Sequence, residues 1–264
     1  MDLDTVRTSQ NEPEKHEPYL SKEGFTQARI LRGFTEIEEL AKTIMHKGII
    51  CGGYVRYMCS PNHNPIPASD VDVYPFSGDN FDDLKKKFKD EGLTKKHENN
   101  MSITYSRPDD PNHSFFATPT IQLIKPVIEG KVISVGTMEE ILSNFDFTVV
   151  RAGIEFKTVD HDGLTIFLPP NTAMVDADFI HDETNKILRL KNIHCPISST
   201  LRCMKYSRKG YWLPPTHVLT LFEDWDSRSG EYKSKLYDYL AKANEGKGLT
   251  KEQVDELEEL MRID

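Results

Sequence analysis

The stretch IICGGYVRYMCSPNHNPIPASDVDVYPF, residues 49–76, holds the most informative pattern in this chain. Its first three residues are apolar and predict a buried strand. Gly52 and Gly53 follow, and glycine lets a backbone turn tightly and approach a ligand closely. A helix that begins at such a turn points its free N–H groups at any anion in front of it. The first half of the stretch therefore predicts a strand, a phosphate-binding turn and a helix.

The second half of the stretch carries two aspartates, Asp70 and Asp72, which alternate with Val71 and Val73. On a strand, this alternation places both carboxylates on one face and both valines on the other. Two adjacent carboxylates repel each other unless a cation lies between them. The pair therefore predicts a site for a hard metal ion, which prefers oxygen ligands.

The order of a strand, Gly-Gly-x-Val-Arg, a loop and Asp-x-Asp resembles the signature of the polymerase-β-like nucleotidyltransferases. Within that superfamily it is most similar to the head domain of the CCA-adding enzymes and bacterial poly(A) polymerases. These carry Gly-Gly-x-Val-Arg-Asp before their Asp-x-Asp, and Tyr57 stands in the position of that final Asp. Gly-Gly and Asp-x-Asp are each common by chance, so the resemblance depends on their order and spacing.

A second matching segment is FDFTVVRA, residues 145–152. It resembles the Arg-Arg-Asp-Phe-Thr-Ile-Asn-Ala segment that helps form the nucleotide pocket of CCA-adding enzymes. Asp146 matches, whereas Asn144 and Phe145 replace the two arginines, and Arg151 is the nearest substitute. The alternative interpretation is that Asp146 caps or tethers a strand.

A third matching segment covers residues 196–211 and resembles the helix that follows the catalytic head of CCA-adding enzymes. Helical spacing brings Arg202, Lys205 and Lys209 near one face, where they could border a phosphate. The alternative is that this face of the helix is simply solvated.

One position departs from the superfamily pattern. Many of its members carry a third carboxylate in a strand after the Asp-x-Asp pair. Residues 120–124 (TIQLI) predict that strand, and Gln122 occupies the position. An amide does not replace a carboxylate as a strong metal ligand, so Gln122 argues against a mechanism with three carboxylates.

The resemblance implies an enzyme, a metal-dependent nucleotidyltransferase. Such an enzyme moves a nucleoside monophosphate from a nucleoside triphosphate such as ATP to an acceptor hydroxyl, for example an RNA 3′ end. Two Mg²⁺ ions would serve this reaction, and Asp70 and Asp72 would hold both. Two alternatives stay open: a nucleotidyltransferase that modifies a protein or a small molecule, and a nucleotide-binding module that has lost catalysis.

The resemblance also assigns roles to individual residues. The implied catalytic residues are Asp70, Asp72 and Asp146. For Arg56 two roles stay open, a clamp on the phosphates or an anchor for the loop that follows. The residues implied to bind the nucleotide are Gly52, Gly53, Arg56, Arg151, Arg202 and Lys205.

The order of predicted elements indicates an α+β fold. Residues 23–185 are predicted to form a nucleotidyltransferase head, a mixed sheet flanked by helices. Residues 186–264 are predicted to form a small all-helical domain. Residues 1–22 are polar and lack periodicity, so we expect a flexible tail there.

Residue patterns place individual elements in this frame. Apolar residues at helical spacing predict a helix over residues 25–45. Asn171 is predicted to cap a helix that reaches residue 181. Thr137 and Glu140 form a capping-box pattern at the start of a short helix. Other predicted helices lie at residues 80–92, 215–226, 231–244 and 251–263, and other predicted strands at residues 101–105 and 163–168.

Composition limits the class of protein and its partners. The chain has 264 residues, 38% of them hydrophobic, and no apolar run long enough to span a bilayer. The N-terminus lacks a signal-peptide pattern, so we expect a cytoplasmic protein without a membrane partner. The formal net charge of −9 argues against a long duplex or a whole tRNA as partner, although a local basic groove stays compatible with it.

Four cysteines, Cys51, Cys59, Cys195 and Cys203, show no zinc-binding spacing. We therefore expect free thiols and no zinc site.

Overall fold

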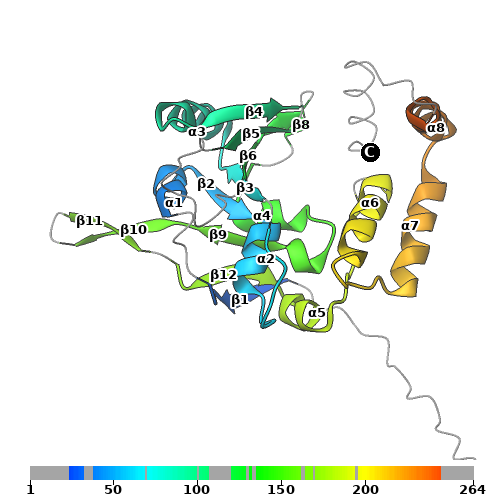
Figure 1. The fold of residues 1–264 in the computed structure, drawn as a ribbon, viewed down its shortest axis with the longest axis horizontal. Coiled ribbons are helices and arrows are strands. Elements are labelled where there is room, and N and C mark those ends of the chain that lie inside the picture. Colours follow the sequence, from blue (N-terminus) through cyan, green and yellow to red (C-terminus); the bar gives the residue numbers. More distant parts are fainter. Residues whose placement is uncertain are drawn as a thin grey trace, which may run out of the picture.

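The structure is a computed structural model that describes residues 24–32, 38–68, 70–99, 101–106, 120–128, 131–132, 135–161, 164–168, 170–193 and 196–244. The predicted tail at residues 1–22 and the predicted helix at residues 251–263 lie outside the described residues. The described chain has the predicted α+β fold, in which a large mixed sheet is flanked by helices (Figure 1).

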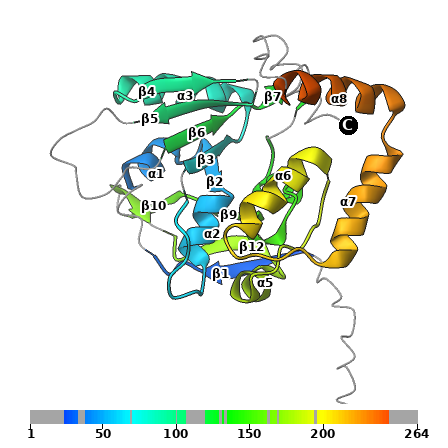
Figure 2. The same cartoon turned by 45° about the vertical axis from the view of Figure 1, so that its right-hand side comes forward.

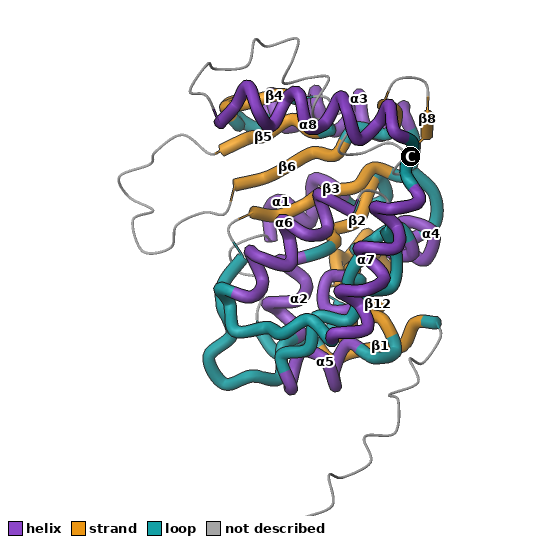
Figure 3. Tube along the Cα trace, turned by 90° about the vertical axis from the view of Figure 1, so that its right-hand side faces the viewer, coloured by secondary structure: helices purple, strands orange, loops and turns teal. Residues whose placement is uncertain are grey.

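The large sheet has eight strands, and only the β3–β6 pair is parallel among its described neighbours. Figure 3 shows the strands stacked from β4 at the top to β1 at the bottom. In spatial order they are β1 (Phe25–Arg29), β12 (Thr172–Asp176), β9 (Ala152–Glu155), β2 (Gly48–Cys51), β3 (Asp70–Pro75), β6 (Thr120–Ile124), β5 (Ser102–Ser106) and β4 (Thr94–Glu98).

Two small hairpins and the helices complete the described fold. The hairpins are β7 (Val127–Ile128) with β8 (Lys131–Val132), and β10 (Lys157–His161) with β11 (Leu164–Leu168). The helices are α1 (Glu38–Ile44), α2 (Gly53–Cys59), α3 (Gly78–Asp90), α4 (Met138–Ser143), the 3₁₀ helix η1 (Thr148–Val150), α5 (Phe179–Asn185), α6 (Pro196–Ser207), α7 (Pro215–Ser227) and α8 (Gly230–Asn244).

The predicted alternation in β3 is confirmed. Val71 and Val73 are fully buried in the main core, whereas Asp70 and Asp72 are partly exposed on the other face. The main core lies between the sheet and helices α1, α2 and α3, and Leu84 of α3 is among its fully buried residues. Burial of apolar surface on one face of β3 thus fixes which face its two carboxylates occupy.

The opposite face of the sheet is covered by α4 over part of its width, where Ile141 packs with Ile49 and Cys51. A third cluster joins η1 to α6 through Phe147 and Tyr206. Helix α6 packs against α7 and lies between α7 and the sheet in Figures 1 and 2. Helix α7 is therefore attached to the sheet through α6.

Two of the predicted helices are wrong in part. Residues 25–29 form strand β1, because they pair with β12 at the edge of the sheet. Residues 172–176 form β12, which lies between β1 and β9 and buries Ala173 and Val175. In both segments, pairing across the sheet outweighs the local helical signal. Within the two predicted ranges, the described residues that do form α-helix are those of α1 and the start of α5.

Other local predictions are confirmed. Thr137 accepts a hydrogen bond from the Glu140 N–H, and Glu140 accepts one from the Thr137 N–H, so the capping box of α4 is complete. The helix predicted at residues 80–92 is α3, which begins two residues earlier with Ser77 as its N-cap. The strands predicted at residues 101–105, 120–124 and 163–168 correspond to β5, β6 and β11.

Replacing Gly48 by alanine tests how tightly β2 and β3 pack. A Cβ at this position would lie 2.5 Å from the Tyr74 carbonyl oxygen. We expect Gly48→Ala to lower the free energy of unfolding by about 1–3 kcal/mol in urea denaturation. Gly78→Ala is the matched control, because no atom lies within 4 Å of its added Cβ. Equal stability of the two variants would contradict the expected clash.

Candidate active site

The turn between β2 and α2 contains the predicted Gly-Gly pair. Gly52 has φ +78°, a backbone conformation that favours glycine. A Cβ on Gly52 would lie 3.3 Å from Asp72 Oδ2 and 3.3 Å from the Phe145 ring. Glycine therefore permits both the turn itself and its close approach to the Asp72 carboxylate.

Asp70 and Asp72 lie beside the strand that carries Gln122. Strands β3 and β6 run parallel in a register that places Asp72 opposite Gln122. The Gln122 amide donates a hydrogen bond from Nε2 to Asp70 Oδ2 over 2.9 Å. The strand predicted for a third carboxylate is therefore present at the site, and it brings an amide to the aspartate pair.

Burial raises the pKa of Asp72 to about 7, and the negative charge of Asp70 adds to the rise. The positive charges of Lys205 and Arg202 act in the opposite direction. Asp72 thus lies between a like charge on its own strand and cations on α6. A carboxylate in such surroundings is stabilised in its charged form when a further cation binds.

The charges of the basic residues predicted on the third segment act on the aspartates. Lys205 is exposed, and Lys209 lies in the turn directly after α6. Burial, together with the charges of Arg56 and Lys205, lowers the pKa of Lys209, while Asp70 acts to raise it. The structure therefore brings Arg202, Lys205 and Lys209 within electrostatic reach of the Asp70–Asp72 pair.

Asp146 joins this group through Arg202. Its side chain is buried, and Oδ2 accepts hydrogen bonds from Arg202 Nη1 at 2.9 Å and Ser199 Oγ at 3.2 Å. Its other oxygen, Oδ1, is also buried and has no hydrogen-bond partner among the described residues. The negative charges of Asp72 and Asp146 both act to raise the pKa of Tyr74, after the larger effect of burial. Tyr74 is thus within electrostatic reach of both carboxylates.

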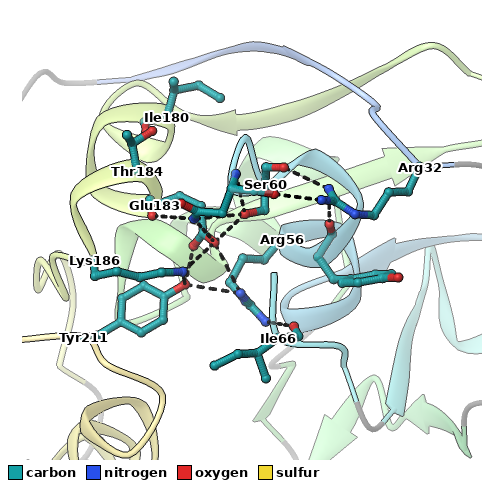
Figure 4. Close-up of polar contacts among 11 residues, drawn as sticks. Arg32, Arg56, Ser60, Ile66, Ile180, Glu183, Thr184, Lys186 and Tyr211 are labelled. Atoms are coloured by element: carbon teal, nitrogen blue, oxygen red, sulfur yellow. Dashed lines mark hydrogen bonds and ion pairs between the residues drawn. The ribbon is translucent and has the colours of Figure 1, made fainter. Parts of the chain in front are cut away.

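The side chain of Arg56 points into a buried network. Its side chain is 1% exposed, and Nη1 lies 3.4 Å from Glu183 Oε1 and 3.2 Å from the Tyr211 hydroxyl (Figure 4). Its Nη2 donates to the Ile66 carbonyl oxygen over 2.9 Å. These contacts correspond to the loop-anchoring role considered for Arg56.

Arg151 is also occupied by structural contacts. Its Nη1 donates to Asp176 Oδ2 over 2.7 Å, and its Nε donates to the Leu142 carbonyl oxygen over 3.0 Å. Its guanidinium lies over the Phe25 ring, 4.9 Å from the ring centre. These partners tie η1 to α4 and β12, so the structure does not bring Arg151 to the aspartate pair.

Sequence reasoning missed the centre of the Arg56 network, Glu183. The Glu183 carboxylate is fully buried and accepts hydrogen bonds from Ser60 Oγ at 2.6 Å and from the Tyr211 hydroxyl. Lys186 Nζ lies 3.2 Å from the same carboxylate. Figure 4 shows these side chains converging from α2, α5 and the segment after α6. No local pattern marks Glu183 as the centre of this network, because Arg56, Ser60 and Tyr211 are distant from it in the sequence.

The oxygen donors at the site are suited to the predicted metal. Asp70 and Asp72 offer hard oxygen ligands, and Gly52 leaves space beside Asp72 Oδ2. Among the described residues, no group of three or more His, Cys, Asp or Glu is placed to hold a metal ion. Two carboxylates fit Mg²⁺, which proteins commonly bind through one or two carboxylates together with substrate phosphates.

Two further predictions concern cysteines and membranes. Cys51, Cys59 and Cys203 are free thiols, and Cys195 lies outside the described residues. Across the described part of the chain, none of the helices has the length and apolar character needed to cross a membrane.

The fold defines a class of protein, an α+β protein in which a mixed sheet is flanked by helices, as the sequence predicted. Solved structures similar to this chain include a tRNA-processing enzyme without ligand (15% identity, TM-score 0.49, 75% of this chain and 49% of that chain). Others are a CCA-adding enzyme without ligand (15%, 0.46, 80% and 51%) and the Thermotoga maritima CCA-adding enzyme complexed with tRNA (14%, 0.45, 69% and 39%). The chain spans about half of the length of the first of these structures.

A family model assigns the chain more narrowly. The model of the Gabija anti-defense 2 family matches residues 25–186, more than half of the sequence. The chain belongs to this family. No curated protein matches it. The family description names a role against the Gabija defence and does not specify a chemical reaction.

Removing the Glu183 carboxylate tests the buried network. Glu183→Ala leaves Arg56 buried beside fewer acceptors, so we expect a loss of about 3–5 kcal/mol in the free energy of unfolding. Glu38→Ala is the control, because Glu38 forms an exposed 3.0 Å pair with Lys42, and its loss should cost less than about 1 kcal/mol. Denaturant titration of both variants measures the difference. Similar losses in the two variants would contradict the anchoring role of Glu183.

Proposed function

We propose that this protein is a metal-dependent nucleotidyltransferase that moves a nucleoside monophosphate from a nucleoside triphosphate to an acceptor hydroxyl. The observation that carries the proposal is the position of Asp70 and Asp72 on one face of β3, where Asp72 lies beside the Gly52 turn and within electrostatic reach of Lys205 and Arg202 of α6. A triphosphate needs both a cation held by carboxylates and positive side chains around its oxygens. This site offers groups for both.

Each group has a distinct part in the proposed reaction. Asp70 and Asp72 would hold Mg²⁺, which supplies positive charge to the triphosphate when bound. Lys205 and Arg202 neutralise phosphate oxygens from the side of α6. Asp146 holds Arg202 in place through Oδ2.

Gly52 and Gly53 supply the turn against which the phosphates lie, with Gly52 giving the close approach to Asp72. Arg56 supports this turn from behind, because it fastens α2 to the loop that leads to β3. Arg151 fastens η1 to the sheet and takes no direct part in binding the triphosphate. The proposed reaction therefore depends on two arginines that position the site and one, Arg202, that belongs to it.

The acceptor in this proposal is a protein or small-molecule hydroxyl, with an RNA 3′ end as the alternative. The net charge of −9 disfavours a long nucleic acid as the acceptor. The family description favours an acceptor that is a component of a defence system. The match to the similar CCA-adding enzyme complexed with tRNA covers only 39% of that chain. A nucleotide-binding module without catalysis is a further candidate, which the amide of Gln122 favours.

Neutralising the aspartate pair tests the proposed reaction. We expect the double variant Asp70→Asn, Asp72→Asn to abolish transfer of label from α-³²P nucleoside triphosphates while keeping its circular dichroism spectrum. The assay uses a whole-cell extract as the source of acceptors, with RNA and protein analysed separately. Asp82→Asn with Asp90→Asn, on the exposed side of α3, is the charge-matched control and should keep full activity.

Undiminished labelling by the aspartate double variant would sink the proposed reaction. Calorimetry tests the alternative of a nucleotide-binding module without catalysis. Such a protein would bind a triphosphate but release no pyrophosphate with any acceptor.

Removing charge from α6 tests the proposed phosphate contacts. We expect Lys205→Gln with Lys209→Gln to weaken triphosphate binding by about a hundredfold or more, because each of the two charged hydrogen bonds contributes about 1.5–3 kcal/mol. Lys85→Gln with Lys86→Gln removes the same charge from the exposed face of α3 and should leave the Kd unchanged. Isothermal titration with a non-hydrolysable analogue measures both. A drop in affinity of the same size in the control would indicate a general charge effect and contradict a contact from α6.

A further inference from the structure

Helix α6 has an exposed side that combines apolar and basic residues. Leu201 and Met204 are 51% and 53% exposed, and Lys205 and Arg208 are exposed beside them. The Arg208 N–H donates to the Met204 carbonyl oxygen, so the helical turn continues to Arg208. Because the four residues follow steps of three and four, they lie along one side of the helix, here called the α6 face. Exposed apolar side chains gathered between polar ones mark an interaction site.

The charge of the α6 face restricts what can bind there. The charged residues in the range 196–209 are all basic, namely Arg202, Lys205, Arg208 and Lys209. A partner that covers the exposed apolar side chains must also lie against these positive charges. The α6 face therefore fits an apolar stripe that is flanked by acidic side chains.

Helix α7 has the same pattern with the opposite charge. Leu219 and Phe222 are 60% and 62% exposed, and the exposed acids Glu223 and Asp226 follow at the same helical steps. An acidic partner would be attracted to α6 and repelled by this side of α7. The two helices thus distinguish a contact that depends on charge from general apolar adhesion.

The chain itself contains a segment of the required kind after α8. Residues 251–263 are predicted to form a helix, in which Val254, Leu257 and Met261 fall on one side together with Glu258. The segment has five acidic and two basic residues, which gives it a net charge of −3. Its sequence therefore supplies both the apolar stripe and the acidic flank.

The connection to α8 is short. Residues 245–250 join α8 to the segment and include two glycines. Six extended residues span at most about 20 Å. Figures 1 and 2 show α8 above the α6–α7 pair, so the segment starts from this side of the molecule. A short flexible tether raises the local concentration of a segment to about the millimolar range, which populates even a weak contact.

We propose that residues 251–263 dock on the α6 face of the same chain and thereby compete with a triphosphate for Lys205. The docking goes beyond the proposed function, whereas the competition rests on it, because that function assigns Lys205 to the phosphates. Acidic side chains of the docked segment take the place of phosphate oxygens. The segment thus acts as an internal inhibitor.

Photo-crosslinking of the full chain tests the docking. Benzoylphenylalanine in place of Leu201 should crosslink, within one chain, to a peptide from residues 251–263 that mass spectrometry identifies. Benzoylphenylalanine in place of Phe222 is the matched control on α7 and should give at least about tenfold less of this product. A product that joins two chains, a product that lacks residues 251–263, or equal yields from the two positions would overturn the docking.

Reversing charge in the segment tests why it docks on α6. Glu258→Lys with Glu259→Lys should lower the crosslink yield from position 201 by about tenfold or more, because the like charges then repel. Asp82→Lys with Asp90→Lys makes the same change of net charge on the exposed side of α3 and should leave the yield unchanged. An equal effect of both pairs, or of neither, would contradict recognition by charge.

Releasing the segment tests the competition. Leu257→Ser with Met261→Ser removes its apolar contacts. If about two thirds of the molecules are docked, the Kd of a non-hydrolysable triphosphate analogue should fall about threefold in this variant. Leu219→Ser with Phe222→Ser on α7 is the control and should leave the Kd unchanged. Isothermal titration measures both, and an unchanged Kd in the released variant would overturn the competition.

The crosslink forms without nucleotide, so it separates the docking from the proposed function. A crosslink from position 201 to residues 251–263, in a protein that binds no triphosphate even after release of the segment, would uphold the docking and contradict the proposed function. Nucleotide transfer by a protein that lacks the crosslink would uphold the function and contradict the docking.

Discussion

The pairing of β3 between β2 and β6 is the constraint on which the rest of this structure depends. Its register sets Asp72 opposite Cys51 on one side and Gln122 on the other. Because strand side chains alternate, burying Val71 and Val73 in the core forces Asp70 and Asp72 onto the opposite face. A slip of one residue would exchange carboxylates for valines. Core packing and site chemistry are thus two faces of the same strand.

The buried ion pairs give the candidate site its fixed frame. Arg56 and Glu183 join α2 to α5, and Arg151 and Asp176 join η1 to β12. Breaking such a pair leaves a charge in a medium that solvates it poorly, which makes these contacts intolerant of change. Arg56 and Arg151, which lie in the two motifs that resemble the CCA-adding enzymes, therefore stabilise the fold. The positive charge around the aspartates comes from α6 instead. The division of roles follows from burial: Arg56 is 1% exposed, whereas the Arg202 side chain is half exposed.

The sequence correctly predicted the structural features that depend only on neighbouring residues. The alternation of β3, the Gly-Gly turn and the Thr137 capping box depend on neighbouring residues, and all three are present. It was insufficient where partners are far apart. Strand β1 is set by its pairing with β12, which lies over a hundred residues later, and helical spacing alone could not reveal it. The same distance hides the partnership of Arg56 with Glu183. The sequence motif identified Arg56, but its role in the fold depends on partners that the motif does not contain.

The charges at the site explain why the departure at Gln122 is compatible with a working arrangement. A third carboxylate would add repulsion to a pair in which burial and Asp70 already raise the pKa of Asp72 to about 7. An amide instead donates to Asp70 and relieves part of that repulsion without adding charge. The positive charges of Lys205 and Arg202 on α6 also act on Asp72 and offset part of the negative charge there. The amide at Gln122, which adds no charge where a carboxylate would, and the basic residues of α6 therefore both limit the excess of negative charge around the aspartate pair.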